Sequence, residues 1–115
     1  MFYRESWVEV DLDQIKENIR WLRRQTDRQF IAVIKANGYG AGDGPVARAA
    51  LEAGAAMLAV SSLDEALSLR YQGITAPILI LGVVDPSQAE LLLRYDLAVP
   101  AVSLDWVKEL VQVPV

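Results

Sequence analysis

The chain contains neither cysteine nor histidine. Without cysteine, disulfide bonds and thiolate chemistry are excluded. Without histidine, the chain lacks the commonest general base and the commonest metal ligand, so acid–base chemistry falls to lysine, tyrosine, aspartate or glutamate, and we expect no metal site. No apolar run is long enough to span a bilayer, and the first residues lack the apolar core of a signal peptide. We therefore expect a cytoplasmic protein that does not bind membranes.

An excess of positive charge is also missing. The 115 residues carry a formal net charge of −4, and a mildly acidic chain without a basic stripe is a poor nucleic-acid binder. Apolar residues make up 53% of the chain and charged residues 23%, which argues against disorder. The length is sufficient for one modest domain with a real core, and no linker or second-domain boundary interrupts it.

Short apolar runs alternate with amphipathic segments along the whole chain. Residues 7–11 alternate apolar and polar side chains, which predicts a half-buried strand. Asp11 or Asp13, Ser62, and Ser103 or Asp105 are expected to cap helices, with Glu65 completing a capping box after Ser62. The remaining pattern predicts strands at 29–35, 57–60, 78–81 and 97–102, and helices at 13–25, 44–54, 62–72, 85–95 and 106–111.

Regular alternation of strands and helices predicts an α/β protein built on a parallel sheet. The later strands are apolar without a period of two, which is typical of parallel strands buried on both faces. Two architectures fit this pattern, an open doubly wound sheet and a (β/α)8 barrel. A full barrel takes about 250 residues, whereas the chain supplies only about four βα units and ends on an apolar segment, so we expect a part of a larger domain.

Lys35 closes the apolar run 30–34 and opens a glycine-spaced stretch, 36–44. A lysine at the end of a buried strand loses hydration, so its neutral, nucleophilic form becomes easier to reach and can form a Schiff base. Tyr39 follows in the same loop and could reach a group bound beside Lys35. Taken singly, however, Lys35 could be an exposed residue at a strand end, and Tyr39 a loop aromatic packed on the rim.

Glycines at 38, 40, 42 and 44 suggest a phosphate-binding loop. The dinucleotide fingerprint fails, because its third glycine would fall on Asp43 or Pro45. The P-loop also fails, because no Lys-Ser or Lys-Thr pair follows the last glycine. The spacing therefore argues against nucleotide binding. Backbone N–H groups of the loop could still face a phosphate, and a plain βα turn fits equally well.

The stretch Ala32-Val33-Ile34-Lys35-Ala36-Asn37-Gly38-Tyr39-Gly40-Ala41-Gly42 closely resembles the signature of alanine racemases. Segments 7–12, 47–55, 63–66 and 76–79 resemble the same family in register, so the resemblance covers essentially the whole chain. It implies the fold of a fold-type III pyridoxal 5'-phosphate (PLP) enzyme, a TIM barrel followed by a β-rich domain. Residues 1–115 would form about the first half of that (β/α)8 barrel, preceded by an N-terminal strand, with the C-terminal β domain absent.

The resemblance also implies an activity, the interconversion of L- and D-alanine that supplies D-alanine for cell-wall peptidoglycan. Lys35 would carry PLP as a Schiff base and act in catalysis, and Tyr39 would contact the cofactor phosphate. Leu81 would wall the cofactor pocket, unless it is ordinary barrel core. The expected partners are an amino-acid substrate and, in the full-length protein, a second copy in a homodimer. The opposing catalytic tyrosine lies outside this chain, so we expect this segment to be inactive alone.

Two positions depart from the family pattern. Ala41 stands where the family usually has histidine, and Gly38 stands where it usually has alanine. Both changes leave Lys35 and Tyr39 in place, so they bear on the rigidity of the loop more than on the chemistry. The alternatives are a racemase for another amino acid such as serine, a related barrel decarboxylase, a non-catalytic PLP-binding module, and a plain structural α/β domain.

Overall fold

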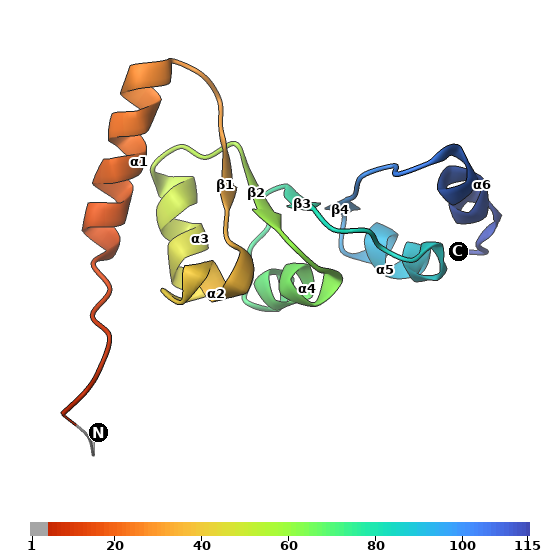
Figure 1. Cartoon of the computed structure of the whole chain (residues 1–115), viewed down its shortest axis with the longest axis horizontal. Helices are drawn as coiled ribbons and strands as arrows, with labels where there is room; N and C mark the ends of the chain where they lie inside the picture. The colour runs from red at the N-terminus through yellow and green to blue at the C-terminus, as the bar shows by residue number, and fades with distance from the viewer. Residues whose placement is uncertain (1–4) are drawn as a thin grey trace.

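The computed structural model describes residues 5–115 and forms a four-stranded parallel sheet with helices packed against it (Figure 1). Each strand pairs in parallel with the next one along the chain, so the spatial order is β1-β2-β3-β4. A doubly wound sheet reverses its strand order at a switch point, whereas a barrel adds strands in sequence. The order therefore favours the barrel. The strands are β1 (Ile31–Val33), β2 (Met57–Val60), β3 (Ile78–Ile80) and β4 (Leu97–Ala98).

The helices begin where the sequence predicts caps. Asp11, Ser62 and Ser103 each accept a hydrogen bond from the backbone N–H three residues further on, which satisfies a donor that the first helical turn leaves open. The predicted capping residues are thus confirmed for three helices. The helical elements are α1 (Leu12–Thr26), α2 (Lys35–Tyr39), α3 (Asp43–Glu52), α4 (Leu63–Tyr71), the 3-10 helix η1 (Pro86–Gln88), α5 (Ala89–Arg94) and α6 (Leu104–Gln112).

One hydrophobic core lies between the sheet and helices α3 and α4. Every second strand residue points into it, and small side chains on the helices, such as Ala47 and Ala66, are fully buried there and allow close packing. The opposite face is covered unevenly. Ala59 of β2 is buried, but Ile31 and Val33 of β1 are 46% and 38% exposed. Burial on both faces, which we expect for the later strands, is therefore confirmed for β2, whereas one face of β1 is exposed. The core strand residues are Ile34, Leu58, Val60, Ile78 and Ile80.

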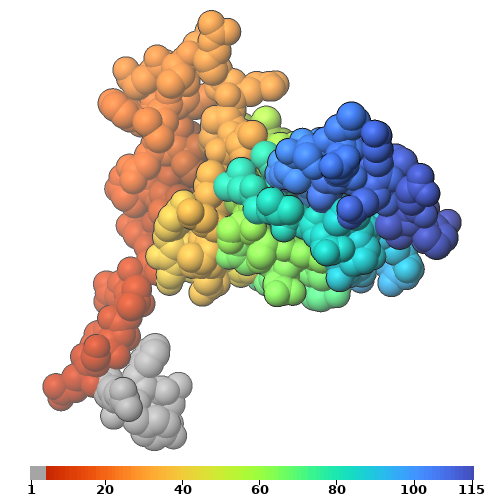
Figure 2. Space-filling model, turned by 45° about the vertical axis from the view of Figure 1, so that its right-hand side comes forward, coloured from red at the N-terminus to blue at the C-terminus, as the bar shows by residue number. Residues whose placement is uncertain are grey.

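The predicted strand at residues 7–11 is wrong. This segment is extended, but it projects beyond α1 and away from the sheet, and no strand among residues 5–115 pairs with it (Figures 1 and 2). Alternation of apolar and polar residues favours an extended conformation with one buried face. A β-strand forms, however, only where a neighbouring strand pairs with its backbone N–H and C=O groups. Residues 1–4, which the predicted domain includes, lie outside the described range.

The predicted strand at 97–102 is confirmed only at its start, because β4 ends at Ala98. Pro100 follows closely and has no N–H to donate to a sheet. Within residues 5–115, no helix combines the length and the apolar character needed to cross a bilayer.

We expect the 115-residue polypeptide to self-associate when it is produced alone. The outer edge of β1 lacks a partner strand in this sheet, and Ile31 and Val33 leave apolar surface exposed on that strand, as Leu81 does at the end of β3. Light scattering coupled to size-exclusion chromatography should show species larger than a monomer. Val33→Lys should shift them towards monomer, whereas Val8→Lys, away from the sheet, should not. A monodisperse monomer of the unchanged polypeptide would contradict this expectation.

Candidate functional site

Lys35 stands at the carboxyl end of β1, on the rim of the sheet where barrel enzymes carry their reactive groups. Lys35 is the first residue of α2, because Ile34 (ψ 15°) already leaves the extended conformation, whereas Ile31 and Val33 share one face of the strand. Backbone bonds from Ile34 N to Ala59 O (2.8 Å) and from Leu81 N to Val60 O (2.7 Å) continue the sheet to its rim. The ends of β1, β2 and β3 are therefore adjacent, and Lys35, Ser61 and Leu81 follow them along one edge.

The expectation that Lys35 is buried is wrong for this chain. Its side chain is exposed, as are Ile31 and Val33 on one face of β1. The reason is geometric: β1 is an edge strand of the described sheet, and the helices pack on its other face. The amine is thus open to solvent and accessible to a ligand arriving from the uncovered face.

The stretch after Lys35 is a tight turn instead of an open loop. Ala36, Asn37 and Gly38 have left-handed backbone angles, with φ of 53°, 55° and 64°, and Tyr39 follows with φ of 57°. A left-handed helical conformation costs an L-residue about 1–2 kcal/mol. Such a turn persists only where its surroundings hold it in place. It also reverses the chain immediately beyond the lysine.

Glu65, at the start of α4, holds the near end of this turn. Its carboxylate accepts a hydrogen bond from Ala36 N (2.6 Å), the amide nitrogen next to Lys35, and one from Ser61 N (2.8 Å). The Ser61 hydroxyl donates a third, very short bond. Burial alone would raise the pKa of Glu65, but these hydrogen bonds outweigh it and hold the pKa below its usual value. Glu65 is therefore a charged link between the ends of β1 and β2.

The far end of the turn is tied to α3 and α4. The Asn37 side-chain oxygen accepts from Asp43 N (2.9 Å). The Asp43 carboxylate accepts from Gly44 N (2.7 Å), Ser68 Oγ (2.8 Å) and Gln72 Nε2 (3.0 Å). Burial opposes ionisation of Asp43, but its side-chain partners Gln72 and Ser68, with the Gly44 N–H, lower its pKa. The turn is thus held at one end by the Glu65 carboxylate and at the other by the Asn37 side chain, which bonds the backbone of Asp43 at the start of α3.

The proposal that loop N–H groups face a phosphate is wrong for most of the turn, because these groups donate within the protein. Gly38 N bonds Ile34 O (2.9 Å), and Gly42 N bonds Asn37 O (2.9 Å). Others of the same stretch are equally engaged, so a side chain is the better candidate for a phosphate contact from this segment. The engaged N–H groups are those of Ala36, Gly38, Gly40, Ala41, Gly42, Asp43 and Gly44.

Tyr39 is such a side chain, since it is 66% exposed at the end of the turn. With Gly40 and Ala41 it lines a groove of about 490 Å³ against residues 8–11 and the first turns of α1, a groove whose lining does not include Lys35. The structure thus places Lys35 and Tyr39 on one turn, but not in one pocket of the described chain.

The two departures from the family pattern fall in this turn. Gly38 is buried with φ of +64°, and an added Cβ would lie 3.4 Å from Val46. Glycine therefore suits this position, because it adopts a left-handed conformation without the Cβ penalty. Ala41 is half-buried at the groove beside Tyr39.

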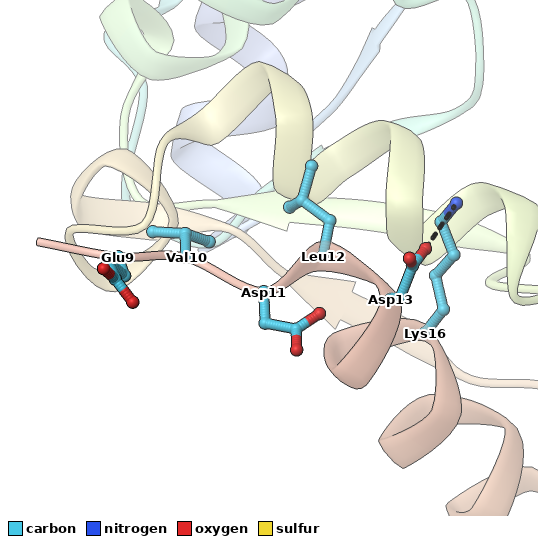
Figure 3. A pocket seen from close by; sticks show the side chains of 6 residues that line it. All are labelled: Glu9, Val10, Asp11, Leu12, Asp13 and Lys16. Atoms are coloured by element: carbon cyan, nitrogen blue, oxygen red, sulfur yellow. Dashed lines mark ion pairs between the residues drawn. The ribbon is translucent and has the colours of Figure 1, made fainter.

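A depression of about 650 Å³ at the start of α1 is a poorer candidate site. Figure 3 shows its acidic side chains spread along the segment and not converging, with Asp13 paired to Lys16 at 3.9 Å. Asp11 is used as the cap of α1, and Lys16 also binds Glu52 at 2.6 Å. Among residues 5–115, no cluster of acidic side chains is suited to a metal ion.

The strands are parallel and follow one another in barrel order, and Lys35 lies on the rim after the first of them. These features are typical of (β/α) barrel proteins that use a lysine amine as a nucleophile. The family model for the N-terminal domain of alanine racemase matches residues 10–115. The chain therefore belongs to the alanine racemase N-terminal domain family.

Individual relatives agree. Alanine racemase of Geobacillus stearothermophilus is 52% identical over 110 residues, which cover 94% of this chain and 28% of that protein. The crystal structure of alanine racemase from Bacillus anthracis with bound L-Ala-P superposes with a TM-score of 0.90 at 46% identity, covering 97% of this chain and 30% of that one. The structure of histidine racemase from Leuconostoc mesenteroides superposes with a TM-score of 0.88 at 29% identity, covering 96% of this chain and 30% of that one. The chain spans about 28% of the length of the curated relatives.

Sequence reasoning singled out Lys35 and Tyr39 as candidates but missed the contact of Glu65 with the turn that carries them. The only signal was local, since Glu65 is the expected partner of Ser62 in a capping box. Its bond to Ala36 joins residues 29 positions apart, and no local pattern encodes that contact.

Proposed function

We propose that this chain is the N-terminal portion of the PLP-binding barrel domain of an alanine racemase. In this proposal Lys35 bears PLP and Tyr39 contacts the cofactor phosphate. The observation that carries it is the position of Lys35, whose accessible amine stands at the carboxyl end of β1 before a fixed turn. Similarity to alanine racemases over nearly the whole chain supports the same assignment.

The residues present fit the cofactor in a simple division of roles. The Lys35 amine is the nucleophile that a carbonyl cofactor requires, and the exposed Tyr39 hydroxyl can donate to a phosphate oxygen where the backbone N–H groups are already engaged. When bound, PLP stabilises negative charge at the substrate's α-carbon. Lys35 Nζ would then take or return the α-proton on one face of the substrate.

The second face of the substrate needs another proton donor, which we assign to a residue outside this chain. We accordingly propose that racemisation requires the complete protein and that the complete protein is a homodimer. A cytoplasmic location and a role in supplying D-alanine for cell-wall peptidoglycan stay predictions from the family resemblance.

Covalent trapping tests the assignment of Lys35. The longest natural polypeptide that contains this chain should be incubated with PLP, reduced with borohydride and digested. Mass spectrometry is expected to find the pyridoxyl group on the peptide that contains Lys35. Lys16 and Lys108 are internal controls, because both lie in the same chain. A label that is absent, or that is confined to those two lysines, would overturn the proposal.

Substrate choice is a separate question, and one observation favours a second candidate. A histidine racemase shares this fold closely, so this part of the barrel is compatible with racemases for other amino acids. Formation of D-amino acid should be measured with alanine, serine and histidine. Preference for alanine supports the leading proposal, preference for another amino acid supports the alternative, and PLP attachment without turnover would indicate a binding module.

A further inference from the structure

We propose that Glu65 is a positioning residue for Lys35: its carboxylate fixes the backbone turn that follows the lysine and so sets where the amine is presented to PLP. This inference rests on the proposed function of Lys35. It assigns to Glu65 a role at the site beyond the capping of α4.

The contact acts on the lysine's own backbone. Ala36 N belongs to the peptide bond that joins Lys35 to Ala36, and Glu65 accepts its hydrogen at 2.6 Å. Ala36 is left-handed (φ 53°, ψ 49°), a conformation that alanine adopts only at a cost. A charged acceptor makes a stronger hydrogen bond than a neutral one and can offset that cost. Without it, this peptide could relax and swing the Lys35 side chain.

The other end of the link is itself fixed. Glu65 holds both the backbone N–H and the hydroxyl of Ser61, just beyond β2. The Ser61 carbonyl in turn accepts from Gly82 N (3.2 Å), and a Cβ on residue 82 would lie only 2.5 Å from that oxygen. Glu65 therefore links the backbone next to Lys35 to the packed ends of β2 and β3.

A merely structural carboxylate offers a matched comparison. Glu52 binds Lys16 at 2.6 Å and joins α3 to α1, away from the rim. Glu65→Gln is nearly isosteric, but its single amide oxygen can accept from Ala36 N or from Ser61 N and not from both, so one of these two backbone bonds is lost. Glu52→Gln removes a charge and a contact between elements without touching the turn after Lys35.

The experiment uses the longest natural polypeptide that contains the chain, titrated with PLP and followed by the visible absorbance of lysine-bound PLP. Glu65→Gln is expected to weaken PLP binding about tenfold, the lower end of the loss found when a residue that orients a metal ligand is removed. Hydrogen exchange of the apo form should show faster exchange at Ala36 N in Glu65→Gln. Glu52→Gln should leave both the PLP affinity and this exchange rate unchanged.

The outcomes separate two failures. If the unchanged protein binds no PLP on Lys35, the proposed function fails and this inference fails with it. If the unchanged protein binds PLP on Lys35, and Glu65→Gln exchanges faster at Ala36 N yet binds PLP equally well, only the positioning role is overturned. Should Glu65→Gln not fold, or keep slow exchange at Ala36 N, Glu65→Asp decides, because its shorter carboxylate keeps the charge but cannot reach Ala36 and Ser61 together. Unchanged PLP affinity in Glu65→Asp would likewise overturn the inference.

Discussion

Replacing Lys35 with alanine is expected to abolish covalent PLP binding and to lower the rate of racemisation by about a thousandfold or more. The physical reason is that the proposed function gives one amine two tasks, attachment of the cofactor and proton transfer on one face of the substrate. No other lysine stands on the rim of the described sheet, since Lys16 lies on α1 and Lys108 on α6. The measurements are the visible absorbance of lysine-bound PLP and the formation of D-alanine, both on the longest natural polypeptide.

Lys35→Arg separates charge from nucleophilicity. Arginine keeps the positive charge at the rim but stays protonated and cannot form the covalent link, so this variant should fail as completely as Lys35→Ala. Lys108→Ala, an exposed position on α6, is the matched control and should retain the absorbance of the unchanged protein. Full absorbance and turnover in Lys35→Ala would remove Lys35 from the mechanism.

Features that depend on a few neighbouring residues could be predicted from the sequence. Asp11, Ser62 and Ser103 precede amphipathic segments, and each caps a helix because the bond it makes spans three residues. The parallel strands could also be predicted from the sequence, because a run such as Ile78–Ile80 is short and apolar and lies between two segments with a helical pattern. Choosing between a doubly wound sheet and a barrel required the strand order, which no local pattern contains.

Features that depend on distant partners could not be predicted in this way. Residues 7–11 have the alternation of a strand, but no described strand lies beside them. Lys35 ends an apolar run, yet it is exposed because β1 lies at the edge of the described sheet. The glycines suggested either a loop that faces a phosphate or a plain βα turn, and the structure has a left-handed turn that Asn37 and Glu65 hold through bonds to Asp43 and Ala36. The sequence thus identified Lys35 as a candidate, but it did not predict the contacts of Glu65 and Asn37 that hold the turn beside it.

Arg70 is expected to make the largest single contribution of any polar side chain to the stability of this sheet. Its guanidinium donates to four carbonyl oxygens, those of Ile74 (2.9 Å), Ala76 (2.8 Å), Tyr95 (2.7 Å) and Asp96 (2.9 Å). These carbonyls lie on the chain entering β3 and β4, so one side chain of α4 fixes the approach of both strands. Arg70→Ala should lower the free energy of unfolding by about 2–4 kcal/mol, because several acceptors lose a charged donor together.

Urea unfolding of the apo form of the longest natural polypeptide measures this effect. Arg94→Ala is the control, because Arg94 pairs only with Glu90 on the surface of α5 and should cost about 0.5 kcal/mol. Arg70→Lys should recover little of the free energy of unfolding that Arg70→Ala loses, since an ammonium group cannot reproduce the planar guanidinium that reaches two loops at once. A loss below about 1 kcal/mol in Arg70→Ala would contradict the prediction. Because Arg70 acts on the approach to β3 and β4 and Glu65 on the turn after Lys35, Arg70→Ala that remains folded should keep the PLP affinity that Glu65→Gln loses.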